Sequence, residues 1–89
     1  MEEERFFLYD EKEKSDTRFV SFMGETHRHD LALVKTSRYY GKTLVLDIQG
    51  NRFGIIGHDD IEEPGYLEHA FNLTEVDAEE LREFLREAI

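Results

Sequence analysis

TLVLDIQGNRFGII, residues 43–56, is the stretch that decides the fold. Apolar side chains alternate on both sides of Gly50-Asn51, a pair of residues typical of a tight hairpin turn. A two-residue turn places Ile48 opposite Phe53, and the large apolar side chains of both strands then share one face. A three-residue turn would place Ile48 opposite Arg52 instead. The stretch therefore predicts an antiparallel hairpin with a two-residue turn.

Three apolar runs precede this hairpin, and each has the residue types of a strand. They are residues 5–9 (RFFLY), 18–23 (RFVSFM) and 31–34 (LALV), separated by polar connections. The run 18–23 carries apolar side chains on both of its faces. This pattern is typical of a strand covered on both sides, so we expect it to lie in the centre of a sheet.

The chain after the hairpin begins with residues 58–65, a polar segment with the only proline, which predicts a loop. Residues 66–73 alternate as a strand does but also fit a helical turn, and their shortness favours a strand. A helix is predicted over 74–89, where Thr74 can cap the N-terminus. Its apolar stripe has the i, i+3, i+4, i+7 spacing of a helix that packs on a sheet: Leu81, Phe84, Leu85 and Ala88.

Together these elements predict one α+β domain over residues 1–89. We expect disorder at 1–4, a mostly antiparallel sheet of five or six strands within 5–73, either open or curled toward a small barrel, and one C-terminal helix over 74–89 that packs on the sheet.

The composition excludes several classes of partner and site. The chain has 21 acidic and 11 basic residues and a net charge of −10, which repels nucleic acid and anionic membrane surfaces and attracts basic protein surfaces. It contains no cysteine, so it can form neither disulfides nor thiolate metal sites. With no signal peptide and no long apolar run, we expect a cytoplasmic protein that binds no membrane.

Two clusters of histidine and aspartate suggest a metal site as one alternative. His27 and His29 precede one apolar run, and His58 and Asp59 follow the hairpin. Imidazole and carboxylate suit a divalent transition metal, which could support hydrolysis. The four ligands converge only if the strand order is rearranged, because a simple meander places the two clusters at opposite ends of the sheet. Otherwise they are solvated loop residues, and no cofactor is expected.

The favoured hypothesis is a non-enzymatic protein-interaction module, since no complete catalytic motif is present. Tyrosines beside loops can anchor a partner through their apolar rings and hydroxyl groups. A following acidic loop would suit a basic or amphipathic protein segment. An exposed edge strand could also pair two copies into a homodimer. The candidate partner-binding residues are Tyr39, Tyr40, His58, Asp59, Asp60, Glu62 and Glu63.

A family resemblance rests on five segments: residues 5–9, 18–24, 39–47, 56–60 and the ending Leu85-Arg-Glu. In these segments the chain resembles a family of small cytosolic Firmicute proteins that is known only as a domain of unknown function. The resemblance extends over nearly the whole chain. It implies a small cytoplasmic protein and supplies no catalytic residue, ligand or partner.

Overall fold

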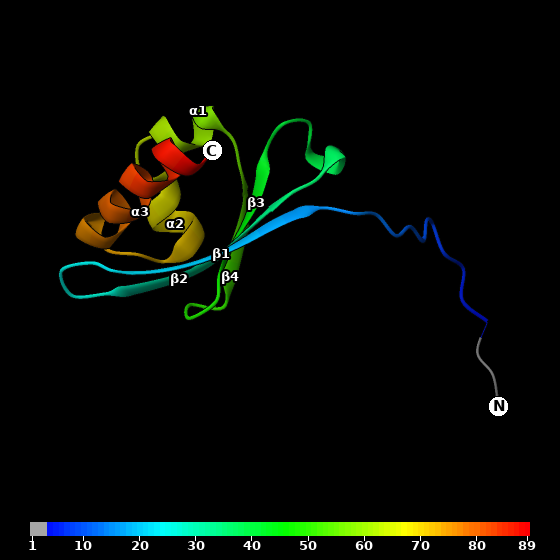
Figure 1. Cartoon of the computed structure of the whole chain (residues 1–89), viewed down its shortest axis with the longest axis horizontal. Helices are drawn as coiled ribbons and strands as arrows, with labels where there is room; N and C mark the ends of the chain where they lie inside the picture. Colours follow the sequence, from blue (N-terminus) through cyan, green and yellow to red (C-terminus); the bar gives the residue numbers. More distant parts are fainter. Residues whose placement is uncertain (1–3) are drawn as a thin grey trace.

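The computed structural model describes residues 4–89, and four antiparallel strands form its sheet in the order β1-β2-β3-β4 (Figure 1). The prediction of disorder at residues 1–4 falls mostly outside the described residues. The strands are β1 (Asp16–Met23), β2 (Arg28–Lys35), β3 (Thr43–Asp47) and β4 (Arg52–Ile56), with the short 3-10 helix η1 (Ser37–Tyr39) between β2 and β3. The helices α1 (His58–Glu62), α2 (Tyr66–Phe71) and α3 (Glu75–Ala88) follow.

All three helices lie on the same face of the sheet (Figure 1). Alternate side chains of the strands point toward this face, because successive residues of a strand face opposite sides. They meet the buried side chains of the helices and form one core, which consists of Leu31, Leu33, Val45, Ile56, Ile61, Leu67, Phe71, Ala78, Leu81 and Leu85. The fold is therefore an open sheet with one helical layer.

The helix α3 confirms the predicted C-terminal helix. The backbone N–H of Asp77 donates to Oγ1 of Thr74 at 3.1 Å, which satisfies one of the free donors of the first turn. Leu81 and Leu85 are fully buried, and Phe84 and Ala88 are partly buried against the same core. The apolar stripe thus packs on the sheet as its spacing indicates.

The sheet has four strands and is not a barrel, so the prediction of five or six strands was wrong. Residues 5–9 form no strand, because their high strand propensity finds no neighbouring strand to pair with. Within the predicted strand 66–73, residues 66–71 form the helix α2 instead. Gly65 and Asn72 flank this helix in left-handed conformations, and Leu67 and Phe71, four residues apart, bury one helical face. The predicted loop 58–65 contains α1.

The register of the hairpin also differs from the prediction. Asp47 pairs with Arg52, so four residues and not two connect β3 to β4. The buried Asp47 explains the longer turn, since its Oδ1 accepts the backbone N–H of Gly50 at 3.1 Å. Because the register is offset by two residues, the apolar side chains still share one face. Leu46 lies opposite Phe53 in the observed pairing.

The strand β1 is an edge strand and not the predicted central strand. The side chains of Val20 and Phe22 pack against the core, whereas Phe19 and Met23, on its other side, are mostly exposed. The apolar residues on both sides of this strand therefore do not indicate two covering layers. One side of the sheet has no cover among residues 4–89.

Candidate interaction surface

The uncovered side of the sheet is lined by apolar side chains from all four strands. The pairing aligns Phe19, Ala32, Leu46 and Phe53 in one row across the sheet, and the neighbouring row ends at Ile55. We call this surface the open face. It comprises Phe19, Ala32, Val34, Leu44, Leu46, Ile48, Phe53 and Ile55.

The large side chains at the margins of the open face are the most exposed. Phe19 is 75% exposed, Phe53 65% and Ile48 55%, whereas Ala32 in the centre is only 6% exposed because its neighbours surround it. Single exposed apolar residues are common on protein surfaces, but a continuous patch of this kind marks a binding surface. The open face is thus the main candidate site.

A neutral polar cluster bounds one end of the open face. Ser21 donates to the carboxylate of Asp30 at 2.6 Å, Gln49 donates to it at 2.8 Å, and Arg28 pairs with it at 3.1 Å. The hydrogen bonds from Ser21 and Gln49, with the charge of Arg28, lower the pKa of Asp30. The ion pair of Arg28 and Asp30 therefore adds no net charge at this end of the open face.

An N-terminal arm, residues 4–15, precedes β1 and runs away from the sheet (Figure 1). Its apolar side chains are uncovered: Phe6 is 91% exposed and Leu8 89%. Arg38 in η1 holds the base of the arm. Its guanidinium donates to Glu11 and Glu13, each at 3.0 Å, and lies 5.0 Å from the centre of the Tyr9 ring. The arm is therefore anchored at one end of the sheet.

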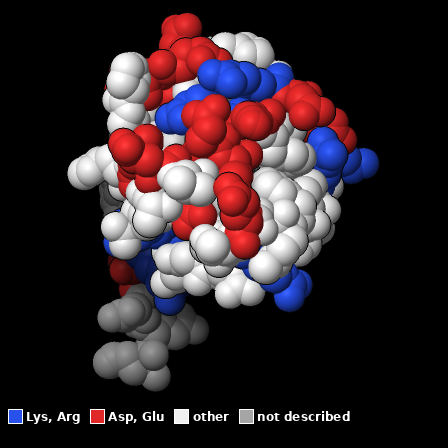
Figure 2. All heavy atoms as spheres, turned by 90° about the vertical axis from the view of Figure 1, so that its left-hand side faces the viewer, with Lys and Arg blue, Asp and Glu red and all other residues white. Residues whose placement is uncertain are grey.

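The negative charge of the chain is concentrated in the helical layer. Residues 58–89 contain eleven acidic residues against two arginines, a net charge of −9, whereas residues 1–57 have ten acidic and nine basic residues. Figure 2 shows acidic side chains gathered over the helical side of the molecule. The open face lies on the opposite side of the sheet, away from this charge.

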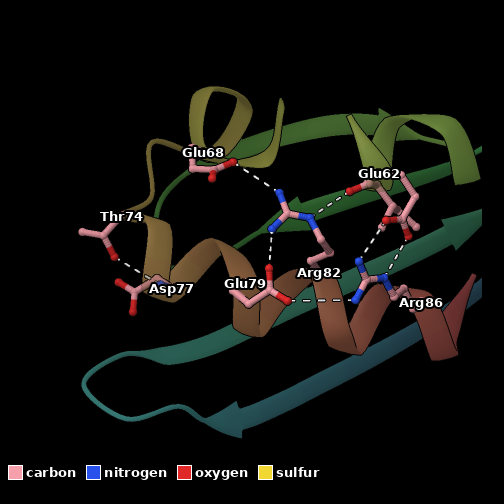
Figure 3. A network of polar contacts seen from close by, with 8 residues as sticks. Glu62, Glu68, Thr74, Asp77, Glu79, Arg82 and Arg86 are labelled. Carbon is pink, nitrogen blue, oxygen red and sulfur yellow. Dashed lines mark hydrogen bonds and ion pairs between the residues drawn. The ribbon is translucent and has the colours of Figure 1, made fainter. Parts of the chain in front are cut away.

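The two arginines of the helical layer connect its helices (Figure 3). Arg82 in α3 donates through Nε to the carbonyl oxygen of Ile61 at 2.9 Å and pairs with Glu79 at 2.7 Å and Glu68 at 3.4 Å. The pair of Glu79 and Arg82 is an i, i+3 contact within α3. One side chain thus contacts the helical layer at three points.

Arg86 joins α3 to α1 in the same network (Figure 3). Both of its hydrogen bonds to the Glu62 carboxylate are 2.8 Å long, and they lower the pKa of Glu62. Glu62, a predicted contact residue, is therefore already bonded within the domain.

The other predicted partner-binding residues lie at one end of the sheet. Tyr40, which follows η1, is 96% exposed and has a left-handed backbone conformation. Lys42 pairs with Asp60 at 3.1 Å and so links the connection between β2 and β3 to α1. Tyr39 is half-buried, and exposed members of the predicted set, His58, Asp59 and Glu63, lie on or beside α1.

Asp60 has a structural role in this group. Its Oδ2 accepts the backbone N–H of Gly57 at 2.8 Å, at the N-terminus of α1, and receives the Lys42 contact. The Gly57 hydrogen bond and the Lys42 ion pair lower the pKa of Asp60. The sequence predicted a carboxylate available to a partner, whereas the structure places it in a helix cap.

The four residues of the predicted metal site do not converge. The meander places His27 and His29 beside the β1–β2 turn, and His58 and Asp59 at the opposite end of the sheet. Within residues 4–89, no group of three histidine, aspartate or glutamate side chains is arranged to bind a metal ion. A site composed of these four residues is therefore wrong for this structure.

His29 belongs to the core. It is 2% exposed, its ring stacks on Phe22 at 4.7 Å between centroids, and its Nε2 is 2.9 Å from Oε1 of Glu80 in α3. Glu80 also accepts the backbone N–H of Glu25 at 2.8 Å, and the hydrogen bonds from His29 and Glu25 lower the pKa of Glu80. These contacts attach the β1–β2 turn to α3.

The comparisons with known proteins identify the family alone. A family model described as SAV0927-like matches residues 8–87, and a search of curated proteins finds no match. In the part of the chain that the structure describes, no helix is long and apolar enough to cross a membrane. The family match confirms the predicted resemblance: the chain belongs to the SAV0927-like family, an uncharacterised family named after a Staphylococcus aureus protein.

Proposed function

We propose that the protein is a non-enzymatic protein-interaction module that binds a partner protein through the open face. The observation that carries this proposal is the continuous apolar row from Phe19 on β1 to Phe53 on β4, in which both phenylalanines are exposed although 36% of the residues in the chain are charged. Burying each exposed phenylalanine would contribute about 1.5–3 kcal/mol to association. The partner supplies an apolar surface that complements the open face.

The carboxylates in the predicted contact region support a structural more than a catalytic role. Asp60 caps α1 and pairs with Lys42, and Glu62 is bonded to Arg86. Both side chains are thus occupied in holding the helical layer.

The absence of cysteine from the sequence agrees with action in the cytoplasm.

The exposed aromatic end supports a second contact area of the same module. Tyr40 is exposed in the connection between β2 and β3, which Lys42 links to α1, and Asp59 and Glu63 are exposed on or beside that helix. An exposed tyrosine and exposed carboxylates at the same end of a sheet suit a basic or amphipathic protein segment. This area keeps the partner class predicted from the sequence and adds to the open face.

A photo-crosslinker tests both areas. p-Benzoylphenylalanine replaces Phe53 in one variant, Tyr40 in a second and Val76 in a control, in which an exposed apolar residue on α3 is changed. We expect discrete crosslinked protein adducts from Phe53 in cells, far fewer from Val76, and a distinct set from Tyr40. Mass spectrometry identifies the crosslinked chains. If Phe53 yields no more adducts than Val76, the open face is not a protein-binding surface.

A further inference from the structure

Taking the proposed function as its basis, we infer that the partner of the open face is a second copy of this chain, whose N-terminal arm packs across that face. The two copies exchange arms, so that each open face receives the arm of the other copy. The chain contains both halves of this contact, an uncovered apolar face and an uncovered apolar arm.

The phenylalanines show how much apolar surface is left over. Four of the seven phenylalanines are more than half exposed: two in the arm, Phe6 and Phe7, and two on the open face, Phe19 and Phe53. Because 36% of its residues are charged, the chain has enough polar side chains to cover its surface, so a shortage of polar residues does not explain the exposed phenylalanines. Both groups would be buried by one association.

The apolar area of the open face is too small for a stable dimer unless the arm contributes to the interface. At roughly 200 Å² for a fully exposed large side chain, the four most exposed side chains of the open face present roughly 450 Å². Residues 6–9 of the arm present roughly 600 Å² by the same reasoning. A stable protein interface buries about 800 Å² on each partner. The open face alone is therefore too small, whereas face and arm together exceed this size.

The position of the arm favours a second copy over closure within one chain. Arg38 binds Glu11, Glu13 and the Tyr9 ring at the end of the sheet where β1 begins, and the arm continues outward from there (Figure 1). The molecule is 52 Å long, and its radius of gyration of 15.4 Å exceeds the roughly 12 Å of a compact 89-residue domain. The projecting arm leaves its own open face uncovered.

The charge distribution allows two copies to meet face to face. The helical layer, residues 58–89, carries a net charge of −9 and lies on the side of each sheet that would point away from the contact. The open face consists of apolar side chains, and the ion pair of Arg28 and Asp30 at its end has no net charge. Two acidic chains can therefore associate through these faces with their charged layers far apart, where salt screens the repulsion.

The open face also has a place for an arm side chain. A shallow hollow of about 190 Å³ is lined by Phe19 and Ile48, by the polar residues Ser21 and Asp30, and by Val20 and Leu31, whose side chains belong to the core on the other side of the sheet. An apolar side chain in this hollow would cover the exposed edge of Phe19. The two-fold symmetry of such a dimer gives each copy the same contact, as is usual for homodimers.

Sedimentation equilibrium and light scattering over a range of concentrations test the assembly. We expect the full chain to have twice its 10.6 kDa mass at micromolar concentration. Phe53→Thr and the double variant Phe6→Ser/Leu8→Ser should each weaken the dimer at least tenfold, while the control Val76→Thr should not. The changed residues are exposed in one copy, so circular dichroism should show intact folding.

Cysteine crosslinking tests the exchange of arms, because the chain has no cysteine of its own. In the double variant Leu8→Cys/Phe53→Cys, oxidised glutathione should produce covalent dimers, since the arm of one copy meets the face of the other. Mixed single variants Leu8→Cys and Phe53→Cys should give the same crosslinked pair. Val76→Cys with Leu8→Cys should crosslink much more slowly.

Each contrary result is informative. A monomeric mass at all concentrations would overturn the inference. So would a disulfide formed within one chain, or a dimer that Phe53→Thr weakens and the arm variant leaves unchanged. If the protein is monomeric but a crosslinker at Phe53 captures a different protein, the proposed function stands and only the second copy is excluded as its partner. If the protein is monomeric and Phe53 captures nothing above the Val76 control, both proposals fail.

Discussion

Arg82→Ala should destabilise the domain much more than Arg86→Ala, although both arginines lie on α3 and both pair with carboxylates. The side chain of Arg82 is 12% exposed and donates to the carbonyl oxygen of Ile61. A hydrogen bond from a charged donor contributes about 1.5–3 kcal/mol to stability. The ion pairs with Glu68 and Glu79, which are more exposed, together contribute at most about 1 kcal/mol to the free energy of unfolding. The expected loss is therefore about 3 kcal/mol.

Urea denaturation followed by circular dichroism measures this loss at a fixed protein concentration. A domain of this length has a stability of about 4–13 kcal/mol, so Arg82→Ala should still fold. In thermal unfolding, its midpoint should be lower than that of the wild type by about 12–24 °C. Arg82→Lys should restore little, because one ammonium group cannot reproduce the planar arrangement of donors.

Arg86→Ala is the matched control. The Arg86 side chain is 47% exposed, and its partners are carboxylates that water can solvate, so we expect a small effect. The reasoning is refuted if Arg86→Ala destabilises the domain as much as Arg82→Ala, or if Arg82→Ala lies within about 0.5 kcal/mol of the wild type. The first result would show that the exposed pairs of Arg86 contribute as much as the bond to the Ile61 carbonyl, and the second that this bond does not hold α3 against α1.

Two further predictions concern the helix ends. Thr74→Ala should lower the free energy of unfolding by about 1 kcal/mol, because it removes the hydroxyl that accepts the backbone N–H of Asp77 in the first turn of α3. Thr74→Ser keeps a hydroxyl and should keep most of the stability, and thermal unfolding distinguishes the two variants. The pKa of Asp60 is lowered, first by the backbone N–H that it accepts at the start of α1. Its contribution is therefore complete above the unfolded value near 3.8 and is lost as the pH falls through the lower folded value. Asp60→Asn should reduce stability at neutral pH and flatten its acid dependence in urea titrations between pH 7 and 2, and an unchanged acid limb would contradict this role.

Local patterns explain which parts of the fold the sequence could predict. The helix α3 has a capping threonine and an apolar stripe within its own residues, so its position follows from local chemistry. The shared apolar face of the β3–β4 hairpin follows from alternation, which a two-residue error in register does not change. The predicted length of the turn was wrong, because the Asp47 side chain closes a longer loop through its hydrogen bond with Gly50.

Tertiary contacts explain most of the rest. Alternation does not show which side of a strand is covered, so the sequence pattern predicts a strand around Phe19 that is covered on both sides, whereas residues 4–89 supply one helical layer. The polar partner of His29 is Glu80, which is 51 residues away, and no local spacing indicates that pair. The signal that was available for the open face is the number of covering elements: one amphipathic C-terminal layer can cover only one side of a sheet.

The order of the elements along the chain has a consequence for biosynthesis. The four strands leave the ribosome before the three α-helices, because α1, α2 and α3 follow β4 in the sequence, and each strand can pair with the strand before it as it emerges. At that stage both sides of the sheet are bare, and the finished segment, residues 1–57, has a net charge of only −1. Near-neutral chains with exposed apolar strands associate readily. Residues 58–89 therefore reduce the association of nascent chains in two ways. They cover one side of the sheet, and their negative charge keeps the chains apart.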